Sequence, residues 1–195
     1  MQNSAQAHPL FRQPIANYAD YLEFERKIQE LAQQMQINLS DYEIDHLSIR
    51  VNSALTGKSW LTALLKCGKI LSDNVVNGRV IYLISLDKPL LFAGRFVEII
   101  ELPFPKNKCY PEESWEHIEI VSPFLPNEST NDWYQRIQTT FLWNQSSLFN
   151  VKSDEPNMEG EQLPNPSVAV SFADKSDNHT CIKVHPYNIK NIIKV

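Results

Sequence analysis

Asp45-His46-Leu47-Ser48-Ile49 and Glu116-His117-Ile118-Glu119-Ile120 lie 71 residues apart in the sequence and share one pattern. Each stretch reads acidic residue, histidine, aliphatic residue, polar residue, isoleucine, and such alternation is typical of a half-buried β-strand. A segment with helical spacing and then three strand-like segments follow each stretch. The repeat therefore predicts an α+β fold built from two similar βαβββ units.

The elements of the first unit are expected between residues 41 and 105. In order, they are a strand at 44–51, a helix at 58–67, and strands at 69–76, 79–86 and 96–102. Asn77-Gly78 supplies the positive φ angles of a tight turn between the second and third strands. Gly68 is the expected C-cap of the helix, and the fourth strand follows Lys88-Pro89.

The second unit is expected between residues 112 and 195. In order, its elements are a strand at 115–121, a helix at about 129–143, strands at 147–152, 167–172 and 180–185, and a short helix from 188. A helix at about 18–36, with Asn17 as its N-cap, lies in an N-terminal extension over residues 1–40. We treat residues 1–195 as a single domain.

The composition excludes several classes of protein. The net charge is -5, with 43% hydrophobic and 21% charged residues, which is typical of a packed globular chain. No cluster of Lys and Arg favours nucleic acid as a partner. The longest apolar stretches are too short to span a bilayer, and no secretory signal is visible. Three cysteines without CxxC spacing fit reduced thiols, so we expect a cytoplasmic protein without a membrane partner.

Motifs for several common chemistries are missing. The five glycines form neither a GxGxxG nor a GxxxxGK[ST] phosphate loop. No GxSxG nucleophile elbow and no HExxH zinc helix occur in the sequence.

Candidate metal ligands fall on the first and last strands of the two units: His46, Glu101, His117 and His185. Imidazole nitrogens and a carboxylate oxygen suit a divalent zinc, iron, nickel or manganese ion. If the two units pair symmetrically, these strands converge on one cleft and predict a metal site there. The alternative is that each histidine is satisfied by hydrogen bonds within the sheet.

Three further residues share the faces of these strands, as side-chain alternation predicts. Glu119, on the face of His117, is a candidate catalytic base or else a charge at a half-solvated sheet. Arg50, on the face of His46, is a candidate substrate-binding residue that would orient an anion. Lys183, on the face of His185, would add positive charge for the substrate. The alternative for both cations is a bridge to surface carboxylates.

Several short motifs resemble the YecM family, and the match extends over most of the chain, from about residue 18 to residue 193. In order, they are Asp45-His46-Leu47-Ser48-Ile49-Arg50, Leu71-Ser72-Asp73-Asn74 with Asn77-Gly78-Arg79, Glu101-Leu102-Pro103-Phe104-Pro105, Tyr110-Pro111, Trp115-Glu116-His117-Ile118-Glu119-Ile120-Val121, Leu163-Pro164-Asn165-Pro166 and Lys183-Val184-His185-Pro186. That family in turn resembles the vicinal oxygen chelate superfamily of glyoxalases, extradiol dioxygenases and bleomycin-resistance proteins.

The resemblance implies two paired βαβββ modules that form an incomplete barrel around a divalent metal ion. In the superfamily pattern one ligand comes from the first and one from the fourth strand of each module, which His46, Glu101 and His117 match. The fourth ligand is most often a glutamate, whereas this chain offers His185. The implied function is a metal-dependent isomerase, lyase or dioxygenase for a small oxygenated molecule, or else a protein that binds such a molecule without chemistry. The implied assembly is a monomer or homodimer.

Overall fold

The structure is a computed structural model that describes residues 7–155 and 163–193. The beginning of the predicted N-terminal extension and two short pieces of the second unit lie outside these residues. Within the part described, no helix has the length and apolar character that crossing a membrane requires.

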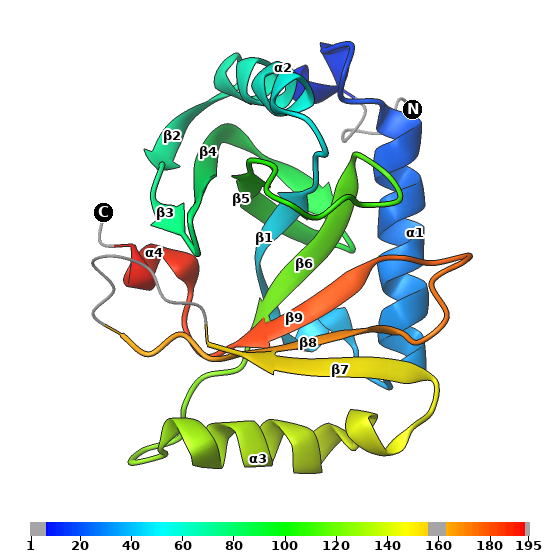
Figure 1. Cartoon of the computed structure of the whole chain (residues 1–195), viewed down its shortest axis with the longest axis vertical. Coiled ribbons are helices and arrows are strands. Elements are labelled where there is room, and N and C mark those ends of the chain that lie inside the picture. Colours follow the sequence, from blue (N-terminus) through cyan, green and yellow to red (C-terminus); the bar gives the residue numbers. More distant parts are fainter. Residues whose placement is uncertain (1–6, 156–162, 194–195) are drawn as a thin grey trace.

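One curved sheet contains all of the strands described, in the order β2-β4-β5-β1-β6-β9-β8-β7, with the short β3 paired to β4 (Figure 1). The strands are β1 Glu43–Ile49, β2 Gly68–Ser72, β3 Val75–Val76, β4 Arg79–Phe92, β5 Arg95–Pro103, β6 Trp115–Val121, β7 Phe149–Asp154, β8 Ser167–Phe172 and β9 Cys181–His185. The α-helices are α1 Tyr18–Gln34, α2 Ala54–Leu65, α3 Thr130–Phe141 and α4 Ile189–Ile192. The 3-10 helices are η1 Pro9–Arg12, η2 Leu39–Asp41 and η3 Trp143–Gln145.

The strand order is mirrored about the junction between β1 and β6. In the first module β1 pairs in parallel with the last strand, β5, and in the second module β6 pairs in parallel with the last strand, β9. β1 and β6 pair antiparallel and join the modules. The α+β fold with two βαβββ modules is thereby confirmed. Because β2 and β4 line one wall of a cavity and β7 and β8 the other, the sheet is an incomplete barrel.

Helix α1 covers the junction of the modules with one apolar face. Asn17 caps it through Oδ1, which accepts a hydrogen bond from the amide of Ala19 at 2.9 Å, as predicted. Tyr21 and Phe24 are buried and pack on Trp115 at the start of β6, with ring centroids 5.2 Å and 6.0 Å from the indole. This core holds one face of β6 against α1. Residues on the opposite face of β6 line the cavity.

Two boundaries in the first module differ from the prediction. β4 does not end at residue 86 but continues to Phe92, because Pro89 lies where the pairing with β5 shifts register between Ser85 and Leu90. Proline has no amide hydrogen to donate and is tolerated at such an irregularity. The helix begins at Ala54, where the Oγ atom of Ser53 caps it, rather than at residue 58.

Gly68 is not the C-cap of the helix, which ends at Leu65 with Lys66 as its C-cap. Gly68 is the first residue of β2, and a Cβ atom there would lie 2.4 Å from the carbonyl oxygen of Ser85. Close approach to β4 therefore requires glycine. The predicted turn at Asn77-Gly78 is confirmed, with φ angles of 49° and 76°.

Candidate metal centre

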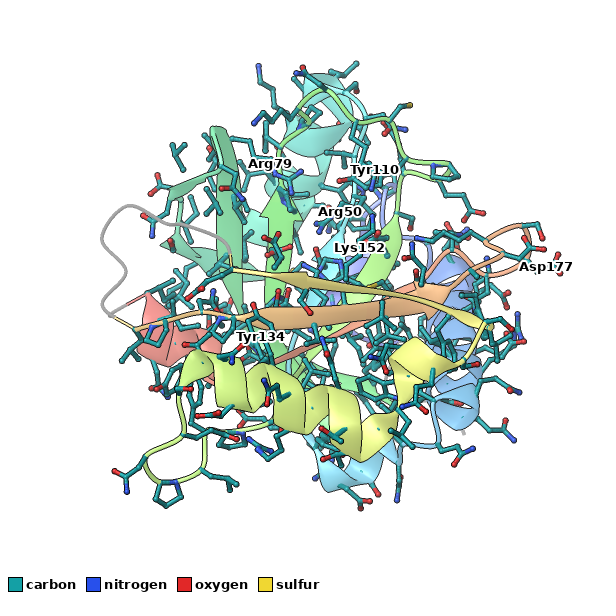
Figure 2. All side chains as sticks on the ribbon, turned by 60° about the horizontal axis from the view of Figure 1, so that its bottom comes forward. Arg50, Arg79, Tyr110, Tyr134, Lys152 and Asp177 are labelled. Atoms are coloured by element: carbon teal, nitrogen blue, oxygen red, sulfur yellow. The ribbon has the colours of Figure 1, made fainter. Side chains whose placement is uncertain are left out.

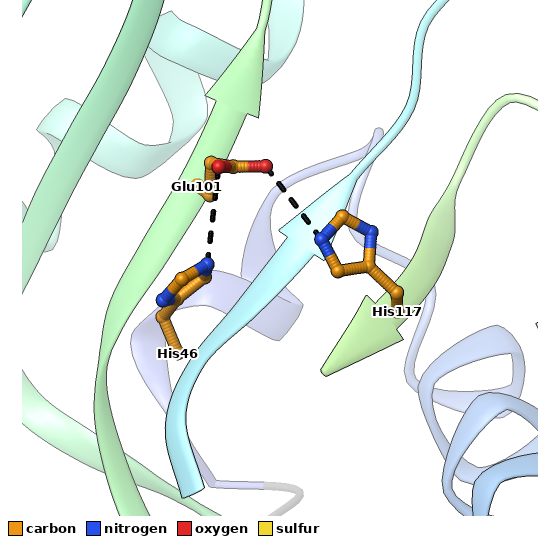
Figure 3. A group of neighbouring side chains, drawn as sticks. All are labelled: His46, Glu101 and His117. Carbon is orange, nitrogen blue, oxygen red and sulfur yellow. Dashed lines mark ion pairs between the residues drawn. The ribbon is translucent and has the colours of Figure 1, made fainter. Parts of the chain in front are cut away.

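Three neighbouring strands carry the candidate ligands to one point. β1 lies between β5 and β6, and Ser48 of β1 is the register partner of both Glu101 and His117. The ligand atoms of His46, Glu101 and His117 all lie within 4.8 Å of one another (Figure 3). Nε2 of His46 lies 3.8 Å from Oε2 of Glu101, and Nε2 of His117 lies 3.8 Å from Oε1 of the same residue. The structure thus brings three of the four predicted ligands together.

A β-bulge stands before each of these histidines. Between Ile44 and His46, β1 advances by two residues while β6 advances by one, so Asp45 is an extra residue. In the same way Glu116 is an extra residue of β6, before His117. Neighbouring residues of a regular strand point to opposite faces, but a bulge redirects a side chain. Each acidic residue therefore lies beside the histidine that follows it.

The two acid–histidine pairs fix the imidazole rings. Nδ1 of His46 lies 2.9 Å from Oδ2 of Asp45, and Nδ1 of His117 lies 2.5 Å from Oε2 of Glu116. A carboxylate that accepts the Nδ1 hydrogen leaves Nε2 as the free ring nitrogen and fixes the ring orientation. Asp45 and Glu116 were not among the site residues predicted from the sequence, although they contact two of the candidate ligands. The acidic residue that opens each repeat was the signal that could have identified them.

The free ring nitrogens fit a metal ion. Nε2 of His46 and Nε2 of His117 are buried and have no hydrogen-bond partner among the residues described. Both face carboxylate oxygens of Glu101 and Glu119 at 3.4–3.8 Å. Tetrahedral zinc holds such ligands at about 2.0–2.2 Å, which separates two ligand atoms by about 3.3–3.6 Å. Because buried polar atoms without a partner are costly, this donor set is suited to holding a divalent cation.

His185 contacts two neighbours of this group, Asp45 and Glu119. Its Nε2 atom faces Oδ2 of Asp45 at 3.3 Å, and its Nδ1 atom faces Oε2 of Glu119 at 3.5 Å. Both oxygens of Asp45 also accept from the backbone amide of Ile189, at 3.1 Å. The structure therefore places His185 against the residue that orients His46, outside the group of three ligand atoms.

Glu119 lies beside the candidate ligands His46 and His117 and is paired with Lys183. Oε1 of Glu119 lies 3.4 Å from Nε2 of His117 and 3.6 Å from Nε2 of His46, and it accepts a hydrogen bond from Nζ of Lys183 at 2.9 Å. Burial raises the pKa of Glu119, but the charges of Lys183 and His46 outweigh burial and lower the pKa well below its usual value. Glu119 is therefore ionised at neutral pH.

Arg50 is buried and is engaged by side chains on both modules. Its Nη1 atom donates to Oγ of Ser48 at 2.7 Å and to Oε1 of Glu101 at 3.1 Å. Its Nε atom lies 3.5 Å from Oε2 of Glu116. The side chain expected to orient a substrate thus holds a candidate ligand, Glu101, and the acidic partner of His117 in place.

The group opens into a cavity of about 420 Å³. His46, Glu101 and Glu119 line it, together with Arg50 and Lys183, whereas His117 lies behind this wall. This volume is within the usual range for sites that bind small molecules, about 300–1,000 Å³.

The stability of the metal-free protein should fall as the pH rises. Burial lowers the pKa of His46, but Glu119 and Asp45 outweigh burial and raise it to about 10, from 6.5 in an unfolded chain. Protonation of His46 then favours the folded state below about pH 6.5, and this contribution is lost as the pH rises through about 10. Urea unfolding across this range should show the decline. His46→Gln should flatten it and His179→Gln should not; an unchanged slope in His46→Gln would contradict the assignment.

Comparisons with known proteins agree with the fold. The profile of a family described as YecM protein matches residues 14–195. An uncharacterized protein of Haemophilus influenzae is 62% identical over 176 residues, which cover 90% of this chain and 91% of that protein. Protein YecM of Escherichia coli is 36% identical over 179 residues, which cover 90% of this chain and 89% of that protein.

A solved structure titled "Structural Genomics, Protein EC4020" is also similar, with a TM-score of 0.76 and 32% sequence identity. The match covers 98% of this chain and 96% of that one. The family profile, the two relatives and this structure all extend over both modules. The chain therefore belongs to the YecM family.

Proposed function

We propose that His46, Glu101 and His117 bind one divalent metal ion and that the cavity beside it binds a small oxygenated molecule. The observation that carries the proposal is the convergence of two buried, orphaned Nε2 atoms on the carboxylate of Glu101. Two histidines and one carboxylate leave coordination positions open, as in mononuclear iron and zinc enzymes. His185 stays outside the ligand set because it faces Asp45 and Glu119.

The reaction class that fits this arrangement is metal-dependent isomerisation, elimination or dioxygenation. A bound metal ion would polarise neighbouring oxygens of the molecule and stabilise negative charge on them. Glu119 is ionised beside the ligands, where it can accept a proton from the bound molecule and return it. Lys183 holds the Oε1 atom of Glu119, and Arg50 holds Glu101 and Glu116.

Binding without chemistry is the second candidate function. Val76, Ile81, Leu83 and Ile189 give part of the cavity an apolar wall. Such a wall would favour retention of an apolar molecule whether or not a reaction follows. Turnover of α-keto acids or catechols by the metal-loaded protein, abolished in Glu119→Gln, would identify an enzyme. Tight binding without turnover would identify the sequestering function.

Metal analysis tests the centre directly. The protein is stripped with a chelator, loaded with zinc, iron(II), nickel or manganese, and analysed by mass spectrometry for metal. We expect about one ion per chain, and an affinity at least about tenfold lower in Glu101→Gln, because the charged donor is lost.

Glu98→Gln is the matched control for this experiment. Glu98 lies on the same strand, β5, but is exposed and forms an ion pair with Lys190. Its replacement should leave metal binding unchanged. Metal uptake that is equally strong in Glu101→Gln and the parent protein, or no uptake of any of the four metals, would refute the proposed centre.

A further inference from the structure

Two sets of charged side chains line the cavity: an inner set that is largely buried and an outer set that is more exposed. Among the residues described, five lysine or arginine side chains and four carboxylate side chains line it, besides His46. The cationic ones are Arg50, Arg79, Lys108, Lys152 and Lys183, and the carboxylates are Glu101, Glu116, Glu119 and Asp154. Which of these charges are already paired decides what kind of ligand the cavity can take.

The inner charges nearly cancel, with two lysine or arginine cations against three carboxylates. Arg50 lies between Glu101 and Glu116, and Lys183 donates to Glu119. All of these side chains are largely buried. A divalent ion on the ligands would therefore add positive charge to a region that is already close to balanced. That addition favours a negatively charged ligand over a neutral or cationic one.

The outer cations are the more exposed ones, Arg79, Lys108 and Lys152. None of them forms an ion pair with a carboxylate among the residues described. Among the residues described, neither Arg79 nor Lys152 makes an ion pair or a side-chain hydrogen bond. Nζ of Lys108 lies over the ring of Tyr110, 4.8 Å from its centroid. Asp154 lines the same wall but lies within ion-pair distance of none of these cations in the part of the chain described.

The two free cations come from opposite modules. Arg79 is the first residue of β4, directly after the turn at Asn77-Gly78, and Lys152 lies within β7. Both line the same cavity, and Figure 2 shows them with Arg50 and Tyr110 in the space between the first module and β7. A ligand that fills the cavity would therefore meet one cation from each module.

We propose that the molecule bound in this cavity carries an oxyanion group, a carboxylate or a phosphate, which Arg79 and Lys152 bind from opposite sides. The inference rests on the proposed function, because the oxygens at the other end of the same molecule would face the metal ion that His46, Glu101 and His117 are proposed to hold. Arginine presents a planar pair of donors to such a group, and lysine presents a point charge. The substrate class is thus a small acid or phosphate ester with neighbouring oxygens.

Anion binding by the full-length chain tests this site. Inorganic phosphate and succinate are titrated into the zinc-loaded and the chelator-stripped protein, and NMR chemical shifts are followed at constant ionic strength. We expect saturable binding of at least one anion, weakened roughly tenfold in Arg79→Gln and in Lys152→Gln, because each change removes a charged donor. The anion that binds more tightly identifies the group as phosphate or carboxylate.

Lys69→Gln is the matched control. Lys69 is an exposed lysine on β2, the strand of the first module that corresponds to β7, and it does not line the cavity. Its replacement should leave anion binding unchanged. Equal anion affinity in Arg79→Gln, Lys152→Gln and the parent protein, or shifts that never saturate, would overturn the proposal.

Zinc content measured on the same samples separates the two proposals. If the protein binds zinc but no anion, the oxyanion site is wrong and the metal centre stands. If the stripped protein binds the anion through Arg79 and Lys152 but takes up no metal, the metal centre is wrong and the oxyanion site stands.

Discussion

His117→Ala is expected to lower the affinity for a divalent metal ion by about a thousandfold. Binding free energies of structural metal sites are about 10–16 kcal/mol and are shared among three or four ligands, so one ligand contributes about 4 kcal/mol. His117 is central to the proposed ligand set because its Nε2 atom faces both Glu101 and Glu119. Competition with a chromophoric chelator measures the affinity in the parent protein and the variant.

His179→Ala is the control for this change. His179 lies on the loop before β9, where its Nδ1 atom faces Glu112 at 3.7 Å, away from the ligand group. We expect its replacement to leave metal affinity unchanged. If both histidine variants lost affinity equally, general destabilisation would explain the loss better than a missing ligand; if neither did, His117 would not be a ligand.

Arg50→Met is expected to destabilise the metal-free protein by about 3–5 kcal/mol. Arg50 is buried between Glu101 and Glu116, whose carboxylates would remain in the interior without their partner. Removing one member of a buried ion pair leaves an uncompensated charge, and that penalty exceeds the worth of an exposed pair. Burial raises the pKa of Glu101 and of Glu116, but the charges around them keep both values well below the usual range. Urea unfolding gives the free-energy change.

Arg26→Met is the control for this change, because Arg26 also pairs with two glutamates but lies on the surface. Arg26 pairs with Glu23 and Glu30 on α1, but its side chain is 58% exposed. Exposed pairs contribute about 0–1 kcal/mol. A loss for Arg50→Met as small as that for Arg26→Met would show that the buried carboxylates do not depend on Arg50. Metal should restore part of the stability lost in Arg50→Met, because it supplies positive charge to Glu101.

The sequence predicted the modules because the pattern of residues in the two first strands is repeated and the later strands are apolar or β-branched runs, although β1 and β6 are buried on both faces. The shared pattern around His46 and His117 placed both residues on first strands, and Glu101 ended the fourth strand of its module. Pairing of the modules along β1 and β6 then brings these three residues together. Local periodicity was sufficient for this part of the fold and the site.

What the sequence did not predict depends on register and on contacts between distant segments. The roles of Asp45 and Glu116 come from two bulges, which exist only once β1 and β6 pair. A regular strand would have pointed both carboxylates away from the ligands. The contacts of His185 with Asp45 and of Arg50 with Glu116 likewise link residues that are far apart in the chain.

The contact between Ile189 and Asp45 joins residues that are 144 positions apart. The carboxylate that orients His46 on the first strand is therefore held by the first residue of α4, which follows the last strand of the second module. During translation the residues of the first module leave the ribosome before those of the second. The ligand group, however, gains His117 only when β6 emerges, and Asp45 gains the amide of Ile189 only after β9. All of these contacts can therefore be in place only after the chain has been made and folded from β1 through α4.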